Sequence, residues 1–397
     1  MNTTDSTSPS VEGKPSAHSP AKPGSSSINT ITDLLCFSHL RWNFVYQRPQ
    51  HLLSRAAAGY RVWFLEEPIR SDQTKMSSYQ PLEGVTVLTP HIPHHTPADE
   101  AVRLQRQLLD EFMQQHQLTN FIAWYYTPMA LLFSDHLKPR LTVYDCMDEL
   151  SAFWGAPPQL LQQEQRLLDR SAIVFTGGIS LFEAKQNRHP QVMAFPSSID
   201  FTHFSQARQA LPDPADQASI AKPRIGFSGV IDERFDYELV GKLADQHPDW
   251  QFVLIGTIVK IDRKLLPKAA NVHYPGMKDY KELPAYFSNW DVAILPFALN
   301  ESTRFISPTK TPEYLAAGLP VVSTPIRDVV RTYGNEDFVQ IADTAEGFGK
   351  AIERALTGRH PENWEQIDRF LTENSWDHTW QEMNRLLLAN AKLAVEQ

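Results

Sequence analysis

Short apolar runs alternate with longer amphipathic segments over the first half of the chain. The apolar runs predict strands, near residues 33–38, 61–67, 85–89, 121–125, 141–145, 172–176 and 191–195. The amphipathic segments predict helices, near residues 47–59, 99–117, 157–170 and 180–188. Strands that alternate with helices indicate parallel βαβ units, and near-continuous apolar strands indicate a sheet that is covered on both faces.

The same alternation restarts after residues 206–223, a polar segment with three prolines that we interpret as an interdomain linker. We therefore expect an N-terminal domain over residues 31–205 and a second domain over residues 224–374. The helical spacing of apolar residues over 375–397 predicts an amphipathic C-terminal helix that packs back toward the first domain. The second domain should contain strands near 224–229, 251–256, 271–274, 291–297, 321–324 and 338–342, and helices near 235–247, 281–288, 312–317 and 345–357.

This organisation predicts an α/β protein with two doubly wound, Rossmann-like parallel sheets that face each other across a cleft. In open parallel sheets, ligands bind beyond the carboxyl ends of the strands. In a two-domain protein, the natural site is the cleft between the domains. Residues that directly follow a predicted strand are therefore the first candidates for function.

Composition narrows the class of protein. Of the 397 residues, 42% are hydrophobic and 21% are charged, which excludes a wholly disordered chain, a collagen and a coiled coil. The net charge of −9 argues against general nucleic-acid binding, so an anionic ligand must meet a local basic site. The two cysteines, Cys36 and Cys146, are too few for a disulfide scaffold or a cysteine-built zinc site, and we expect both to be buried and reduced.

Membrane and export signals are not visible. The longest apolar stretch, residues 121–133, is shorter than the ~18 residues that a membrane span needs. The N-terminus lacks the basic-then-apolar pattern of a signal peptide, so we expect a soluble protein in the cytoplasm. Residues 1–30 hold eight Ser, four Thr, four Pro and no aromatic residue, which predicts a disordered tail. No Lys/Arg cluster supports peripheral membrane contact, so we expect weak or no binding to anionic vesicles.

One segment, SPTKTPEYLAAGLPVVSTP (307–325), has strong helix signals. Thr311 and Pro312 predict the cap and the first residue of a short helix. Gly318 predicts the end of this helix in the left-handed conformation, and the buried strand VVST follows.

The charges of this segment suggest a ligand. Thr309 and Lys310 lie just before the predicted helix, where free N–H groups and the helix dipole favour phosphate. Glu313, in the first turn, can accept hydrogen bonds from vicinal hydroxyls such as those of ribose. A capping Glu and a solvated Lys would give the same pattern, so a purely structural role stays open for both residues.

The pattern K-x-x-E-Y-L-A-x-G-x-P-V-V, which begins at Lys310, resembles the donor-binding segment of the family 4 retaining glycosyltransferases of GT-B fold. The order of the neighbouring segments agrees. GFSGVIDERFDYELV resembles the Gly-containing loop that opens their nucleotide domain. SHLRWNFVYQRPQHLLSRAAAGYRVWFLEEP is similar to a subgroup that includes teichuronic-acid and other cell-surface polysaccharide glycosyltransferases. The resemblance covers about residues 31–390 and is specific as a set.

The resemblance implies the residues that hold a nucleotide diphosphate sugar. Lys310 would hold the donor phosphate, and Glu313 would hold the ribose hydroxyls. Three loops would supply the other contacts: Ser228, Gly229 and Val230 near the diphosphate, Pro275 to Lys278 with Met277 near the base, and Asn300, Ser302 and Thr303 near the sugar. Enzymes of this kind need no bound metal, and we expect no cofactor. The histidines of HIPHH (91–95) have no Cys or acidic residue beside them, so we interpret this segment as a polar loop.

Three positions depart from the family pattern. Phe305 stands eight residues before Glu313, where the family often has a first Glu that contacts the sugar, and Glu301 or Thr303 are alternatives for that role. The segment WYYTPMA (124–130) lacks a His that often follows the fourth strand. The Arg of the family's G-R-x-x-x-x-K phosphate-binding pair is not evident, and Arg234, the nearest basic residue after the Gly loop, is our candidate for that cation.

Candidates on the acceptor side follow three strands of the first domain. Carboxylates at this edge can orient acceptor hydroxyls or act as a base, and we take Asp148 as the candidate catalytic one. For each candidate, a structural role remains an alternative: a satisfied histidine, a capping or solvated acid, or a solvated arginine. The candidates are His39, Arg41 and Trp42 after the first strand, Glu66 and Glu67 after the second, Asp145, Asp148 and Glu149 after the strand near 141–145, and Arg48 at the start of the first helix.

The expected reaction is the transfer of a sugar from a nucleotide diphosphate sugar to a hydroxyl of a sugar or lipid-linked acceptor. The resemblance implies retention of configuration and a role in cell-surface or exopolysaccharide synthesis. Lys310 would stabilise the charge that develops on the leaving diphosphate. Two alternatives remain: a nucleotide-sugar epimerase or sugar phosphorylase of the same architecture, and a degenerate subunit that binds nucleotide sugar without catalysis.

Overall fold

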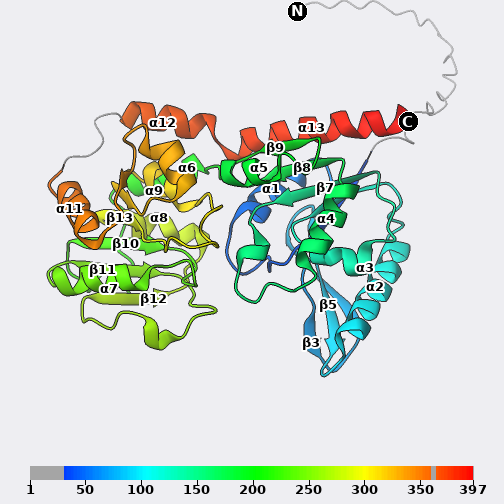
Figure 1. Ribbon diagram of the computed structural model, residues 1–397, viewed down its shortest axis with the longest axis horizontal. Helices are drawn as coiled ribbons and strands as arrows, with labels where there is room; N and C mark the ends of the chain where they lie inside the picture. Colours follow the sequence, from blue (N-terminus) through cyan, green and yellow to red (C-terminus); the bar gives the residue numbers. More distant parts are fainter. Residues whose placement is uncertain (1–30, 359–363, 397) are drawn as a thin grey trace, which may run out of the picture. The chain divides into compact units, whose positions relative to one another are not determined.

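Two largely parallel sheets with helices packed against them form the framework of the protein (Figure 1). The computed structural model describes residues 31–358 and 364–396, so the predicted tail (1–30) lies outside the described residues. Both sheets belong to one compact unit, Ile31–Gln397. The predicted fold class, α/β with two parallel sheets, is confirmed.

The first sheet builds what we call the N-terminal lobe. Its nine described strands have the order β3-β5-β2-β1-β6-β7-β8-β9, and β4 pairs with β5. All pairs are parallel except β4–β5. The strands are β1 (Asp33–Phe37), β2 (Arg61–Leu65), β3 (Ile69–Ser71), β4 (Lys75–Leu82), β5 (Val85–Pro93), β6 (Phe121–Tyr125), β7 (Leu141–Cys146), β8 (Ile173–Thr176) and β9 (Val192–Ala194). The helices between them are α1 (Arg48–Ala56), α2 (Ala98–Gln115), α3 (Leu131–Ser134), α4 (Leu160–Arg170) and α5 (Ile179–Lys185).

The second sheet builds the C-terminal lobe. Its six described strands have the order β12-β11-β10-β13-β14-β15. In chain order this is the 3-2-1-4-5-6 arrangement of dinucleotide-binding folds, so ligands are expected beyond the ends of β10 and β13, where the strand order reverses. The strands are β10 (Arg224–Ser228), β11 (Gln251–Ile255), β12 (Val272–Gly276), β13 (Val292–Leu295), β14 (Val321–Ser323) and β15 (Gln340–Ile341). The helices are α6 (Phe201–Phe204), α7 (Tyr237–Gln246), α8 (Leu283–Phe287), α9 (Lys310–Ala316), α10 (Arg327–Val329) and α11 (Ala345–Leu356).

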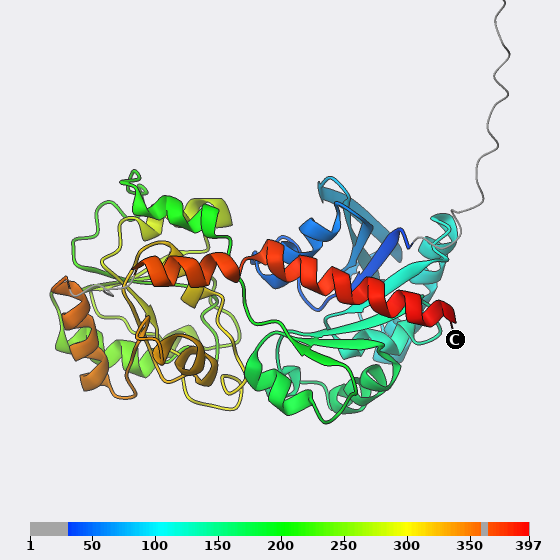
Figure 2. The ribbon, with the colours of Figure 1, turned by 90° about the horizontal axis from the view of Figure 1, so that it is seen from above.

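Two C-terminal helices pack on different lobes. Ile367 and Leu371 of α12 (Trp364–Glu373) are buried in the core of the C-terminal lobe. Trp376 and Met383 of α13 (Trp376–Glu396) are buried in the core of the N-terminal lobe. Figure 2 shows the two helices one after the other, α12 over the C-terminal sheet and α13 over the N-terminal sheet. The last segment of the chain therefore ties both lobes together.

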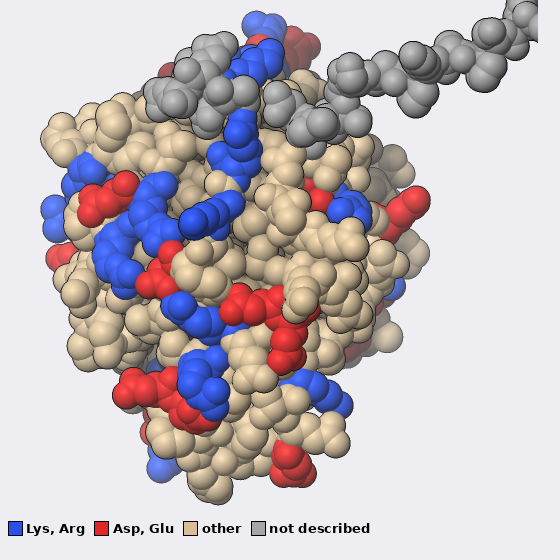
Figure 3. Space-filling view, turned by 90° about the vertical axis from the view of Figure 1, so that its right-hand side faces the viewer, with Lys and Arg blue, Asp and Glu red and all other residues tan. Residues whose placement is uncertain are grey.

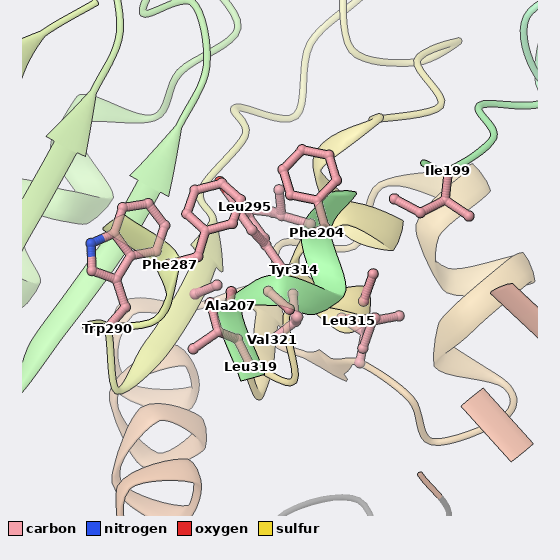
Figure 4. Packing of buried hydrophobic residues seen from close by; sticks show 14 of the residues in the cluster. Ile199, Phe204, Ala207, Phe287, Trp290, Leu295, Tyr314, Leu315, Leu319 and Val321 are labelled. Carbon is pink, nitrogen blue, oxygen red and sulfur yellow. The ribbon is translucent and has the colours of Figure 1, made fainter. Parts of the chain in front are cut away.

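The core under α9 fixes the segment that carries Lys310 (Figure 4). Tyr314 of α9 is fully buried, and its ring lies 5.3 Å from Phe287. The Tyr314 hydroxyl accepts a hydrogen bond from the backbone N–H of Ser228 at 2.7 Å, which joins α9 to the end of β10. Aromatic packing and this bond together set the start of α9 against the loop after β10.

The prediction for the start of α9 is wrong by two residues. The helix begins at Lys310 after Thr309, and the Thr311 hydroxyl makes no hydrogen bond in the described part of the chain. Pro312 is tolerated inside the first turn because the N–H groups of that turn have no partner within the helix. The predicted end is confirmed, since Gly318 has φ of +81°.

Candidate functional site

Two adjoining pockets lie between residues of the two lobes. The first has a volume of about 520 Å³, and the second about 130 Å³. Five residues line both pockets, which makes the pockets continuous: Val45 and Tyr46 from the N-terminal lobe, and Gly229, Val230 and Lys310 from the C-terminal lobe. The pockets lie beyond the carboxyl ends of the strands, where open parallel sheets bind ligands.

Backbone from two loops forms the floor of the first pocket. Gly256 has φ of +146°, and a Cβ atom there would lie 1.7 Å from the carbonyl oxygen of Gly229. The Gly229 N–H donates to the Ile255 carbonyl at 2.9 Å, so the loops after β10 and β11 are held together. Only a glycine at position 256 allows this close approach. Backbone can therefore reach a ligand in the pocket without interference from a side chain.

Lys310 lies at the junction of the two pockets. Its Nζ is 2.7 Å from Glu313 Oε2, and the two side chains are only 12% and 5% exposed. Burial raises the pKa of Glu313, although the Lys310 ammonium opposes that shift. Glu313 lines neither pocket, so it lies behind Lys310. A ligand that contacts Lys310 would compete with this ion pair.

The second pocket contains Asp148 and Arg234. Burial raises the pKa of Asp148 to about 6, even though the nearby Arg234 charge favours the ionised form. The Asp148 side chain makes no hydrogen bond to any residue that the structure describes. Arg234 Nη2 donates to Asp232 Oδ2 at 2.7 Å, and its guanidinium lies 5.2 Å from the Phe153 ring of the N-terminal lobe. The pocket therefore holds a carboxylate that can change protonation near neutral pH, next to a cation.

Other predicted donor residues are divided between the pockets and the surrounding loops. Met277 lines the first pocket, and Thr309 lines the second. Thr303 does not line either pocket, because its hydroxyl hydrogen-bonds the Ala298 carbonyl inside its own loop. Asn300 donates to the Glu233 carbonyl and accepts from Ser302. The loop predicted to touch the donor sugar is thus held by its own hydrogen bonds.

Several acceptor-side candidates pair with one another inside the N-terminal lobe. Arg48 donates from Nε and Nη2 to the Asp145 carboxylate at 2.9–3.1 Å. Their side chains are 4% and 0% exposed. The pKa of Asp145 is raised because burial outweighs the pairing with Arg48. Asp145 therefore anchors α1 to β7 and is not accessible to a ligand, while Arg48 lines the second pocket.

The group after β1 and β2 is also internally bonded. Glu66 accepts the Trp42 N–H at 2.7 Å and the Arg41 guanidinium at 3.1 Å. Arg41 also donates to the Glu67 carbonyl at 2.6 Å. Trp42 is buried but lines the first pocket, so this set holds the wall of that pocket in place.

Of the remaining acceptor-side candidates, Glu149 forms an ion pair and His39 is buried. Glu149 Oε2 lies 2.6 Å from Lys185 Nζ. The Nδ1 atom of His39 is buried without a partner among the described residues. Burial lowers the pKa of His39 to about 4, so its imidazole is neutral at physiological pH. Neither side chain lines one of the two pockets.

The sequence analysis missed two tyrosines that meet across the lobes. The rings of Tyr46 and Tyr280 lie 4.5 Å apart, and both line the first pocket. The Tyr280 hydroxyl is buried and has no hydrogen-bond partner in the described residues. Tyr46 lies in the loop after β1, so the strand-end rule pointed to its neighbourhood. Nothing in the sequence indicated that Tyr280, far along the chain, would pack on it.

The remaining expectations concern a metal site, the histidine segment, the two cysteines and a membrane span. In the described residues, no group of three or more His, Cys, Asp and Glu side chains is placed to hold a metal ion. His91 contacts Ser77 within β5 and β4, so part of HIPHH is strand rather than the predicted loop. Cys36 and Cys146 are free and buried, as predicted. None of the helices described is long and apolar enough to cross a membrane.

Known proteins resemble this chain in sequence. Residues 222–358 match the family described as glycosyl transferases group 1. The chain is 26% identical over 287 residues to the Bacillus subtilis (strain 168) protein named "Putative teichuronic acid biosynthesis glycosyltransferase TuaH", and the match covers 66% of each chain. The match thus leaves about a third of that relative uncovered.

Solved structures share the fold. Sucrose-phosphate synthase from Thermosynechococcus elongatus matches with a TM-score of 0.66 at 15% identity, over 90% of this chain and 98% of the other. The E. coli trehalose-6-phosphate protein bound with UDP-2-fluoro glucose matches with a TM-score of 0.64 at 12% identity, over 91% and 99%. Both structures have this two-sheet arrangement.

Proposed function

We propose that this chain is a glycosyltransferase of GT-B fold that transfers a sugar from a nucleoside diphosphate sugar to a hydroxyl group. The observation that carries the proposal is the continuous pair of pockets with Lys310 at their junction. The first pocket is large enough for a nucleotide, and the second adjoins it at the point where a diphosphate would lie.

The donor would lie with its base and ribose in the first pocket and its sugar in the second. Backbone of Gly229 and Gly256 lines the first pocket near the expected ribose and diphosphate. Lys310 would leave Glu313 to meet the diphosphate, and this movement would uncover Glu313, which lies behind it, for the ribose hydroxyls. Because Lys310 carries a full charge in a largely buried position, it is well placed to stabilise the leaving diphosphate.

The acceptor hydroxyl would enter the second pocket beside Asp148. A carboxylate with a pKa of about 6 is ionised at neutral pH and can orient the acceptor hydroxyl by accepting its hydrogen bond. No second carboxylate lines this pocket as the structure describes it, so a double displacement has no evident nucleophile. A same-face reaction with retention of configuration, in which a donor phosphate oxygen takes the acceptor proton, fits this arrangement.

The wider role is proposed from the relative. The B. subtilis protein carries teichuronic acid biosynthesis in its name, which supports a role in cell-surface polysaccharide synthesis. The cytoplasmic location and the absence of a cofactor stay predictions. Figure 3 shows Lys and Arg side chains interspersed with Asp and Glu on one face, and weak vesicle binding also stays a prediction.

A ligand screen followed by a turnover assay tests the proposal. Nucleoside diphosphates and nucleotide sugars at 100 times their Kd should stabilise the protein by about 2.7 kcal/mol, which thermal shift detects. Release of nucleoside diphosphate should then depend on an added sugar acceptor and persist in EDTA. Reaction of the donor without an acceptor would favour an epimerase. Binding without turnover over a broad acceptor panel would favour a non-catalytic subunit, and no binding of any nucleotide would refute the proposal.

A further inference from the structure

A buried lysine lies directly behind the turn that carries Asp148. Lys185, the last residue of α5, is 2% exposed. Its Nζ lies 2.6 Å from Glu149 Oε2 and 2.7 Å from Glu164 Oε1. The same cation therefore joins α4 and α5 to the turn that follows β7.

Both carboxylate oxygens of Glu149 have a partner, the first being Lys185. Its second oxygen, Oε1, accepts a hydrogen bond from the Ser151 hydroxyl at 2.7 Å. The preceding residue, Asp148, lines the second pocket, and its side chain has no hydrogen bond within the described residues. The Asp148 carbonyl accepts only a weak hydrogen bond from the Cys146 thiol, at 3.5 Å. The orientation of Asp148 thus depends on the backbone of the turn. Main-chain hydrogen bonds from Gly177 N–H to the Cys146 carbonyl and from Ala152 N–H to the Glu149 carbonyl hold this backbone, and the Glu149 carboxylate adds a side-chain anchor to Lys185.

Stability alone is a poor reason for this arrangement. Burying a lysine and two carboxylates costs desolvation energy, and well-packed apolar side chains often replace such groups without loss of stability. In some proteins buried ionic groups are retained because they fix one arrangement among several, and a turn beside a pocket is a place where a fixed arrangement has value.

The helix that carries Lys185 is also held by the other lobe. The Asp328 carboxylate of α10 accepts hydrogen bonds from the backbone N–H of Ser180, in the first turn of α5, at 3.1 Å and 3.3 Å. Arg327 and Arg331 pair with Glu183 of α5 at 2.8 Å and 3.1 Å. Because α5 is fixed at both lobes, its last residue has a defined position relative to the second pocket.

We propose that Lys185 is a positioning residue that acts through Glu149 to hold Asp148 in the second pocket. This inference rests on the proposed function, since it assigns Asp148 to the transfer reaction. Lys185 itself touches no pocket residue that would meet the substrate, so its effect on the reaction is indirect. The charged groups that face Asp148 are Arg48 of α1, Arg234 and Asp232 after β10, and Lys310 across the same pocket.

A matched pair of variants tests the inference in the full-length protein. Both Glu149→Gln and Glu164→Gln remove one negative charge from Lys185, but only Glu149 is part of the turn with Asp148. Glu149→Gln should lower kcat about tenfold or more, with the KM for the donor and the Kd for nucleoside diphosphate within twofold of wild type. Glu164→Gln also loosens Arg188, so it should lower the melting temperature at least as much, while kcat stays within twofold.

A second readout does not depend on turnover. The carboxyl pKa of Asp148 can be followed by NMR titration of labelled aspartate, assigned with Asp148→Asn. A released turn lets the carboxylate reach solvent, so Glu149→Gln should lower the Asp148 pKa from about 6 toward the ordinary value of 3.8, and Glu164→Gln should not. Lys185→Arg should retain more kcat than Lys185→Met.

The outcomes separate this inference from the proposed function. Equal losses of kcat in Glu149→Gln and Glu164→Gln, or an Asp148 pKa unchanged by Glu149→Gln, would overturn the positioning role. Absence of nucleotide binding and turnover in wild type would refute the proposed function instead. In that case the NMR titration still decides whether Lys185 and Glu149 hold the Asp148 carboxylate.

Discussion

The two lobes have the same kind of parallel sheet, but their charged residues near the strand ends differ in burial and in pairing. In the C-terminal lobe, Lys310 stands at an open pocket with its partner Glu313 three residues away. In the N-terminal lobe, Arg48 and Asp145, which are 97 residues apart in the sequence, form a buried ion pair. Lys310 lines both pockets with a side chain that is 12% exposed, whereas Asp145 is fully buried and lines neither pocket.

The difference shows what the strand-end rule can and cannot predict. The rule identifies the edge of a sheet where ligands gather. It does not say whether a charge at that edge is already neutralised by a neighbour. In the N-terminal lobe, Arg41 with Glu66 and Lys185 with Glu149 are neutralised in this way, and Asp148 is the acid that stays in the pocket without a hydrogen bond among the described residues.

The strongest test of this comparison is Asp145→Asn. Removing one partner of a buried ion pair leaves the other charge uncompensated and typically costs about 3–5 kcal/mol. We expect a loss of this size in the free energy of unfolding, measured with urea. The affinity of the folded fraction for nucleoside diphosphate should be unchanged. A loss below about 1 kcal/mol would mean that the ion pair contributes little to stability, and a selective loss of ligand binding would assign Asp145 to the binding site.

Lys310→Ala probes the C-terminal side of the comparison. Loss of one group that stabilises transition-state charge typically costs ~10²–10³ in rate. Diphosphate affinity should fall far more than nucleoside affinity, as measured by calorimetry. Lys350, which is exposed and pairs with Glu346 four residues away, is a matched control, and Lys350→Ala should be silent. Activity of Lys310→Ala within twofold of wild type would remove Lys310 from the donor site.

The pH dependence of turnover tests Asp148. Because burial raises the pKa of this carboxyl to about 6, the ionised form is lost as the pH falls through 6. We expect kcat/KM to fall roughly tenfold per pH unit below that point. Asp148→Asn should have low activity, and its kcat/KM should not show this fall at acidic pH. If the fall remains in the variant, another group causes it.

The same shift has the opposite effect on stability. A raised carboxyl pKa means that the folded state favours the protonated form. The stability that Asp148 contributes is therefore present below pH 3.8 and is lost as the pH rises through about 6. Asp148→Asn should be more stable than wild type at pH 8, as measured by urea unfolding, and a variant that is less stable there would contradict this sign.

The smallest effects are expected for the neighbouring residues Glu66 and Glu67. Glu66→Ala leaves the buried Trp42 N–H without its acceptor, which costs about 1–3 kcal/mol. The side chain of Glu67 is exposed, so Glu67→Ala should stay within about 0.5 kcal/mol in urea unfolding. Equal effects of the two substitutions would mean that the contacts of Glu66 contribute little to the free energy of unfolding.

Much of the fold could be predicted because its signals are local. The predicted strand at 121–125 is β6, residue for residue, and the predicted runs at 33–38 and 141–145 lie within one residue of β1 and β7. The strand β4 was missed because none of its residues is buried and they lack an apolar run. It is a strand because it pairs with β5, and pairing is not a property of its own sequence.

The amino-acid sequence by itself determined the alternation of strands and helices, the left-handed end of α9 at Gly318, and the placing of Lys310 beside Glu313, since each depends on residues a few positions apart. Only the tertiary structure decided that Arg48 and Asp145 neutralise each other, that Lys185 holds Glu149, and that Tyr46 meets Tyr280. These contacts depend on sheet order and on the packing of helices across it. Many partners of suitable charge occur along the chain, and folding brings only certain ones within hydrogen-bonding distance.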